Sequence, residues 1–168
     1  LGLKSSGRDE CANSTDQVRR VPHVSTGHWE LEKKMNYQYL ELEQNNQVAT
    51  VWLNRAELHN AFNTQVIEEL NDCFTALNTR DDVRVVILAG RGKSFSAGAD
   101  LNWMKQAGQA SKQDNEADAL KLAKMLQSLA TLKQPTISRV HGIAFGGGMG
   151  LASACDICVA SEEAKFAT

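Results

Sequence analysis

Two stretches rich in glycine and alanine each connect a strand-like run to a helix-like run, at residues 94–101 and 141–150. Small residues at such a junction let another group approach the backbone closely. The first N–H groups of a helix have no intrahelical acceptor and lie at the positive end of the helix dipole. Two such loops brought together could hold one negatively charged oxygen between two N–H donors, as in an oxyanion hole. The alternative is that these glycines serve only tight turns and close helix packing.

The hydrophobic pattern around these two glycine loops predicts an α/β domain whose strands are joined by covering helices. The first elements are strands at residues 37–43 and 48–53, joined by a turn at 44–47 as a hairpin. The aliphatic run at 83–89 predicts a strand covered on both faces. The other expected elements are an amphipathic helix carrying the apolar positions of 66–77 and capped by Asn63 or Thr64, a polar and mobile segment at 105–114, a helix at 115–132, a strand at 136–140, a helix at 149–154 and a strand at 156–160.

Composition is that of an ordinary globular domain, because 42% of the 168 residues are hydrophobic and 23% are charged. A net charge of -2 gives no reason to expect binding to nucleic acid or to an anionic membrane. The apolar runs are far shorter than the roughly 20 residues of a membrane span. Residues 1–34 are polar and aperiodic, which predicts a disordered or extraneous leader before a domain at residues 35–168. Because the first residue is Leu1, Met35 is the expected natural start.

The four cysteines, Cys11, Cys73, Cys155 and Cys158, are too few for the disulfide framework of a small secreted domain. We therefore expect reduced thiols and a cytoplasmic location. Cys155 and Cys158 form a CxxC motif, for which a redox pair or half of a zinc site is the alternative. No second CxxC and no pair of histidines accompanies it, so small buried thiols are the preferred interpretation.

Two nucleotide-binding patterns fail at the second glycine loop. A dinucleotide fingerprint that began at Gly146 and Gly148 would need a third glycine where Leu151 stands. A start at Gly148 and Gly150 places Ser153 in the third position. A Walker-type phosphate loop is excluded there because no Lys-Ser or Lys-Thr pair follows the glycines at 146–150.

The sequence resembles the enoyl-CoA hydratase/isomerase, or crotonase, superfamily in three motifs that occur in the family's order. These motifs are Val51-Trp52-Leu53-Asn54-Arg55 with Asn60-Ala61, then Phe95-Ser96-Ala97-Gly98-Ala99-Asp100-Leu101, and then Ile137-Ser138-Arg139-Val140-His141-Gly142 with Gly146-Gly147-Gly148 and Ser153-Ala154-Cys155-Asp156-Ile157. Ala56 stands where the family usually has proline. The resemblance covers residues 37–168 and implies a crotonase-type spiral of ββα units, truncated before the C-terminal helical region.

The resemblance also implies roles for single residues. The backbone N–H groups of Ala99 and Gly147 would form the oxyanion hole for the oxygen of an acyl-coenzyme A thioester. Arg55 would lie near the nucleotide phosphates, the alternative being a solvated surface arginine. Coenzyme A is then part of the substrate, and no separate cofactor and no metal is expected. The residues implied to line the coenzyme A path, mostly through main-chain contacts, are Ala97, Gly98, Asp100 and Leu101.

One position departs from the family pattern. Many hydratases of the family carry two glutamates that hold water, and the first of them corresponds to Gly150 here, while the second would fall shortly beyond Thr168. The string around Gly150 resembles the methylglutaconyl-CoA hydratase subgroup, in which a single downstream glutamate would serve as acid and base. The expected activity is addition of water to a 2-enoyl-CoA, with a branched or methylglutaconyl-CoA-like substrate. The alternatives are an enoyl-CoA isomerase and a non-catalytic acyl-CoA-binding homologue.

Further expectations concern single side chains and the assembly. His59 and His141 are candidate acid or base groups, although a structural hydrogen bond is preferred for His141. Asp100 is expected to cap the following helix rather than to act as a catalytic carboxylate. Trp103 and Met104 are expected to pack. The family resemblance implies a homotrimer or hexamer, and a 168-residue piece of the fold, with uncovered sheet edges, is expected to be poorly soluble or inactive by itself.

Overall fold

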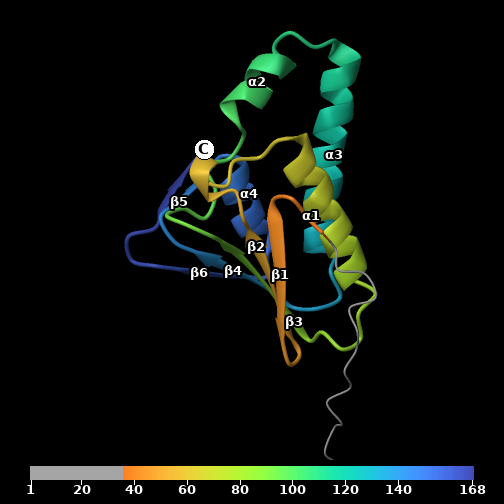
Figure 1. Ribbon diagram of the computed structural model, residues 1–168, viewed down its shortest axis with the longest axis vertical. Coiled ribbons are helices and arrows are strands. Elements are labelled where there is room, and N and C mark those ends of the chain that lie inside the picture. Colours follow the sequence, from red (N-terminus) through yellow and green to blue (C-terminus); the bar gives the residue numbers. More distant parts are fainter. Residues whose placement is uncertain (1–35) are drawn as a thin grey trace, which may run out of the picture. The chain divides into compact units, whose positions relative to one another are not determined.

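The computed structural model describes residues 36–168, so the expected leader at 1–34 lies outside the described residues. A five-stranded sheet has the strand order β1-β2-β3-β4-β6, and a two-stranded sheet pairs β5 with β7 (Figure 1). The strands are β1 (Leu40–Asn45), β2 (Val48–Leu53), β3 (Val85–Gly90), β4 (Thr136–Val140), β5 (Ile143–Phe145), β6 (Ile157–Ala160) and β7 (Lys165–Ala167). The helices are α1 (Thr64–Leu77), α2 (Leu101–Ala107), α3 (Lys112–Ala130) and α4 (Gly147–Ala154), with a short 3-10 helix at Ala56–Leu58.

The larger sheet begins with the predicted hairpin. β1 and β2 pair antiparallel, with Leu40 opposite Leu53 and Asn45 opposite Val48. β1 starts three residues later than the pattern suggested and continues through Asn45, so the turn is confined to Asn46 and Gln47. The pairs β2–β3, β3–β4 and β4–β6 are parallel. Parallel neighbours need crossover connections, and helices supply them, which confirms the α/β prediction.

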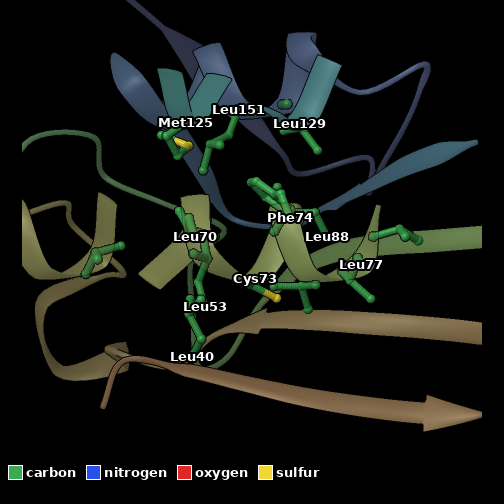
Figure 2. Close-up of a cluster of buried hydrophobic side chains, with 14 of the residues drawn as sticks. Leu40, Leu53, Leu70, Cys73, Phe74, Leu77, Leu88, Met125, Leu129 and Leu151 are labelled. Atoms are coloured by element: carbon green, nitrogen blue, oxygen red, sulfur yellow. The ribbon is translucent and has the colours of Figure 1, made fainter. Parts of the chain in front are cut away.

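One face of the larger sheet packs against the helices and forms the core. Alternation buries Val51 of β2 and places it beside Leu88 of β3, as the pleat of a half-covered strand requires. Figure 2 shows side chains of the strands, α1, α3 and α4 meeting in this core, among them Phe74 of α1. Phe74 is fully buried, and burial of a side chain of this size contributes about 1.5–3 kcal/mol.

The other face of the larger sheet differs from the prediction. Val85 and Ile87 of β3 are only partly buried, so the expectation of cover on both faces is wrong for residues 36–168. The indole of Trp52 lies on this face, with the Arg91 guanidinium 3.7 Å and the Arg139 guanidinium 4.5 Å from its ring centroid. A continuous aliphatic run does not require cover on both faces, because partly exposed valine and isoleucine are tolerated on a sheet surface.

The capping residues predict where the helices start better than the polarity of the sequence does. Asn63 caps α1 as predicted, since its Oδ1 accepts a hydrogen bond of 2.9 Å from Val66 N. The polar segment predicted at 105–114 is partly helical, because α2 continues through Ala107 and α3 begins at Lys112, and its mobility stays a prediction. Ser111 starts α3 by accepting the N–H of Asp114 at 3.1 Å. Polar sequence here marks an exposed helix start rather than a loop. None of the helices in residues 36–168 has the length and apolarity needed to cross a membrane.

The small sheet was not predicted from the sequence. β5 and β7 pair in parallel, and Gly146 N donates to Ala167 O at 2.8 Å just beyond the end of β5. Lys165 begins β7, and Glu162 and Glu163 lie in the exposed turn before it. The short sheet therefore fixes the approach to α4, which starts at Gly147, two residues earlier than predicted.

Candidate functional site

The two glycine loops, far apart in the sequence, lie side by side. Ser96 N donates to Ile143 O at 3.0 Å, and Phe145 N donates to Ser96 O at 3.0 Å. These bonds form a parallel bridge between Ser96 and Ala144. Just before it, Phe95 N donates to His141 O at 2.9 Å. The first glycine loop is therefore held along the second by backbone hydrogen bonds, as a short pair of strands would be.

The loops come closest at Gly98. Its φ of +83° lies in the region that favours glycine. A Cβ placed on Gly98 would lie 2.6 Å from Phe145 O and 3.2 Å from Gly147 N. A side chain is therefore excluded at Gly98, and its absence lets the residue before Ala99 touch the first residue of α4. The structure thus brings together the two segments that carry Ala99 and Gly147.

The N–H groups of Ala99 and Gly147 make no hydrogen bond within residues 36–168. Gly147 is the first residue of α4, so its N–H has no intrahelical acceptor. Ala99 sits opposite Phe62 in a parallel bridge whose bonds use Gly98 O and Asp100 N. Since successive groups of an extended chain point to opposite sides, the N–H of Ala99 points away from the Phe62 backbone. Both donors are left available for a ligand oxygen.

Asn60 anchors the start of the first glycine loop. Its side chain is buried, its Oδ1 accepts Arg55 N at 2.9 Å, and its Nδ2 donates to Arg91 O and Ser94 O at 2.9 and 2.8 Å. Its carbonyl accepts the Ser96 hydroxyl at 2.9 Å. Asparagine suits this place because its φ of +54° is left-handed, a conformation that asparagine tolerates better than most residues. Sequence reasoning gave Asn60 no role, although it belongs to the first family-like motif.

The side chain of Arg55 is mostly buried and is paired with a carboxylate. Its Nη1 lies 2.8 Å from Asp100 Oδ2 and donates to Ala61 O at 3.0 Å, and its guanidinium stacks 5.0 Å from the centroid of the Tyr39 ring. Only 11% of the arginine side chain is exposed. The alternative of a solvated surface arginine is therefore wrong. Its placement near nucleotide phosphates stays a prediction.

Asp100 caps α2, as predicted. Its Oδ1 accepts the N–H groups of Asn102 at 2.7 Å and Trp103 at 3.3 Å. Burial alone would raise the pKa of Asp100, but those two backbone N–H groups and the Arg55 guanidinium outweigh it and hold the pKa below its usual range. The carboxylate is thus ionised at neutral pH and is occupied by structural bonds, which argues against a role as catalytic acid.

A polar pocket of about 380 Å³ opens beside the Arg55–Asp100 pair. It lies between the start of α1 and α2, and its lining residues are Arg55, Asn63, Thr64, Gln65, Asp100, Asn102, Trp103 and Gln106. Trp103 also packs against the core, as expected, whereas Met104 is 55% exposed, which contradicts the expectation of packing. Leu101 is 74% exposed at the start of α2, and Ala97 is half-buried with its N–H bonded to His59 O. The coenzyme A path proposed along these residues stays a prediction.

A sequence profile of the enoyl-CoA hydratase/isomerase family matches residues 43–168. The chain belongs to this family. It is 38% identical over 135 residues to the mitochondrial enoyl-CoA hydratase of Pongo abelii, and this alignment covers 79% of this chain and 45% of that protein. It is 32% identical over 129 residues to 4-chlorobenzoyl coenzyme A dehalogenase-2 of Arthrobacter sp, and this alignment covers 76% of this chain and 47% of that protein. The chain spans about half the length of the curated relatives it matches.

A solved structure extends the family assignment to the fold. The crystal structure of an enoyl-CoA hydratase from Shewanella pealeana ATCC 700345 has a TM-score of 0.76 to this chain at 38% identity, covering 78% of this chain and 49% of that one. The likeness confirms the crotonase-type α/β fold over the matched residues. The names of the relatives span hydration and dehalogenation, so family membership alone does not choose the reaction.

Gly150 leaves a space in this enoyl-CoA hydratase/isomerase family member. A Cβ placed on Gly150 would meet nothing within 4 Å in the part of the chain that the structure describes. By contrast, a Cβ on Gly148, in the same helix, would lie 2.5 Å from Ser96 O. The lack of a side chain at Gly150 is therefore not required by packing, which is compatible with a role in substrate choice.

The histidines and cysteines make structural contacts. His141 Nε2 donates to Gly92 O at 2.9 Å, which confirms the preferred structural role, and His59 Nδ1 lies 3.0 Å from Ser94 Oγ. Cys73, Cys155 and Cys158 are free thiols, and Cys11 lies outside the described residues. Burial raises the pKa of the Cys155 thiol to about 11 and so suppresses the reactive thiolate. Cys158 is exposed, so the expectation of a buried thiol is wrong there, and residues 36–168 contain no metal-ligand cluster.

Proposed function

We propose that the whole protein is an enoyl-CoA hydratase that adds water to a 2-enoyl-CoA thioester. In this reaction water gives one proton to a base as its oxygen bonds to C3, and the electrons of the double bond shift toward the thioester oxygen. C2 then takes a proton from the protonated base as the thioester carbonyl re-forms. The N–H groups of Ala99 and Gly147 would stabilise the charge on that oxygen. The supporting observation is the contact of the two glycine loops at Gly98, next to two N–H groups that have no protein acceptor in residues 36–168.

Two such N–H donors would make a large contribution to the reaction rate. Loss of a single oxyanion-hole donor typically lowers kcat by about 10²–10³-fold. Because both donors are main-chain atoms at the start of α4 and before α2, they need no reorganisation when charge develops. Gly150 has no carboxylate, so the group that transfers the protons must lie elsewhere. We propose that a single glutamate beyond Thr168 acts as acid and base, as in the subgroup that the second loop resembles.

The finer substrate proposal is a branched or methylglutaconyl-CoA-like thioester. It is supported by the open space at Gly150, which leaves room for a bulkier or charged acyl group than a glutamate there would. The test compares kcat/KM of the whole protein for crotonyl-CoA and 3-methylglutaconyl-CoA, followed by loss of the conjugated thioester absorbance. We expect the branched substrate to be preferred, and a preference for crotonyl-CoA would contradict this finer proposal.

The isomerase alternative shares the same oxyanion hole and is separated by product analysis. If the whole protein shifts the double bond of a 3-enoyl-CoA but hydrates no 2-enoyl-CoA, the hydratase proposal is wrong. The non-catalytic alternative predicts binding of an acyl-CoA without turnover of either substrate. Calorimetric titration with a saturated acyl-CoA measures that binding independently of chemistry.

We further propose a cytoplasmic homotrimer or hexamer that needs no separate cofactor. This assembly is supported by the family resemblance alone. Light scattering during size-exclusion chromatography of the whole protein tests the assembly, and a monomer would contradict it. Activity after dialysis against a chelator tests independence from metals.

A further inference from the structure

Phe62 contacts the first glycine loop through its backbone. Its N–H donates to Gly98 O at 2.7 Å, and its carbonyl accepts Asp100 N at 2.8 Å. These two hydrogen bonds enclose Ala99, whose own N–H is left on the opposite side. The backbone of Phe62 therefore fixes the plane and direction of the Ala99 peptide.

The ring of Phe62 contacts the second glycine loop. A Cβ placed on Gly147 would lie 2.7 Å from Phe62 Cε2 and 3.1 Å from its Cδ2, so the ring occupies the place that a side chain at 147 would take. Phe62 is only 2% exposed, and the ring cannot move away into solvent. The start of α4, with the Gly147 N–H, rests against this ring.

The position of Phe62 itself is held from both sides. Ala61 O accepts Arg55 Nη1 at 3.0 Å, and Asn63 Oδ1 caps α1 at Val66 N. A close-packed interior has low compressibility, so a residue that is fixed at both neighbours moves little and transmits displacements to the groups it touches. Phe62 thus joins the two loops through a rigid link, with its backbone on one donor segment and its ring on the other.

We propose that Phe62 is a positioning residue that sets the separation and mutual orientation of the Ala99 and Gly147 amides. The inference rests on the proposed function, because the two amides matter only if they bind the thioester oxygen. Reactions that depend on such preorganisation are sensitive to small displacements, and a shift of about 1 Å can lower the rate by about 10²-fold. Phe62 touches no reacting atom and acts only through the two loops.

The first test replaces the ring while keeping an apolar side chain. Phe62→Leu in the whole protein is expected to lower kcat by about 10²-fold with KM unchanged, because transition-state stabilisation is lost while substrate contacts stay. The matched control is Phe74→Leu, an equally buried phenylalanine of α1 in the core away from the loops. It is expected to lower stability by a similar amount and to leave kcat of the folded protein unchanged.

A spectroscopic readout separates positioning from folding. The bound thioester carbonyl of a saturated acyl-CoA, labelled with ¹³C, should shift downfield when two N–H donors polarise it. We expect this shift in the wild type and in Phe74→Leu, and a smaller shift in Phe62→Leu at saturating ligand. An unchanged shift in Phe62→Leu, together with an unchanged kcat, would overturn the inference alone. A wild type with neither shift nor turnover would overturn the proposed function, and this inference with it.

A reciprocal substitution, Gly147→Ala, tests the same contact from the other side, and this single variant does not depend on the folding of Phe62→Leu. Gly147→Ala is expected to push the ring or α4 aside and to lower kcat, since its Cβ would lie within 2.7 Å of the ring. In the double variant, which carries both Gly147→Ala and Phe62→Leu, the smaller leucine should relieve that clash. Its kcat should therefore be higher than that of the single variant Gly147→Ala. Additive losses in the double variant would contradict a direct link between the two residues.

Discussion

The two glycine loops reach the same place by different means. The first loop is held by specific polar bonds to residues 59–62, among them Ala97 N to His59 O and the Ser96 hydroxyl to Asn60 O, both 2.9 Å. The second loop shares backbone hydrogen bonds with the first loop and with β7, and its side-chain-free residues add close approach, since a Cβ at Gly148 would lie 2.5 Å from Ser96 O. Backbone precision can thus come either from donors and acceptors or from the absence of side chains. The two modes predict different responses to substitution.

The largest expected effect comes from the polar mode. Asn60→Ala removes three hydrogen bonds of the buried amide and leaves a left-handed alanine, so we expect the free energy of unfolding to fall by about 4 kcal/mol. Chemical denaturation of the purified protein measures this change. Asn60→Gly is the control that keeps the backbone conformation and loses only the amide. A loss below about 1 kcal/mol would show that the polar bonds do not hold the first loop.

The packing mode is tested by Gly148→Ala. Because the new Cβ meets backbone at 2.5 Å and the Ser96 Cβ at 2.8 Å, the loops must separate, and we expect a destabilisation of about 3 kcal/mol. The same denaturation experiment measures it, with kcat as a second readout of loop displacement. If this variant is as stable as the wild type, the contact between the loops is looser than the structure indicates.

A smaller effect with a pH signature is expected from the ion pair beside the first loop. Asp100→Asn keeps an acceptor for the α2 cap but loses the charge that faces Arg55, and should lower stability by about 2 kcal/mol at neutral pH. The pKa of Asp100 is lower in the folded protein, so its contribution is present above the ordinary value of about 3.9 and is lost as pH falls through the folded pKa. Wild type and variant should therefore converge in thermal melts below about pH 4. If the melting temperatures of wild type and variant differ by the same amount at every pH, the charge of Asp100 does not supply this stability.

The smallest effect has the opposite sign. Gly150→Ala adds a side chain in open space inside α4 and removes the conformational freedom of glycine, so we expect a gain of about 0.5–1 kcal/mol. It is also the matched control for Gly148→Ala, two residues away in the same helix. Thermal melting at one protein concentration compares the three proteins. A loss of stability in Gly150→Ala would mean that the space is filled in the assembled protein.

The sequence alone predicts features that depend on neighbouring residues. The strands at 48–53 and 136–140 have the predicted bounds, and the caps at Asn63 and Asp100 follow from local chemistry. Features that depend on distant partners were missed. β5 pairs with β7 about one helix and one strand later in the chain, and a run of three residues carries no periodic signal of its own.

The candidate site shows the same division. The resemblance identified both loops, and the structure shows that they touch, but the burial of Arg55 depends on Asp100, which lies 45 residues further along the chain. Phe62 looked like any core phenylalanine, because neither its backbone partner at Gly98 nor the position of its ring against Gly147 is visible in local sequence. Its position directly after Asn60-Ala61 of the first family-like motif was the signal that could have drawn attention to it.

The donors at Ala99 and Gly147 belong to the peptide backbone, and this has an evolutionary consequence. Every amino acid except proline carries the same N–H group, so almost no single codon change can delete either donor outright. Under the proposed function, variation in the surrounding side chains can explore new substrates while the proposed means of polarising a thioester is inherited with the backbone. Relatives named for hydration and for dehalogenation within one family fit such a history.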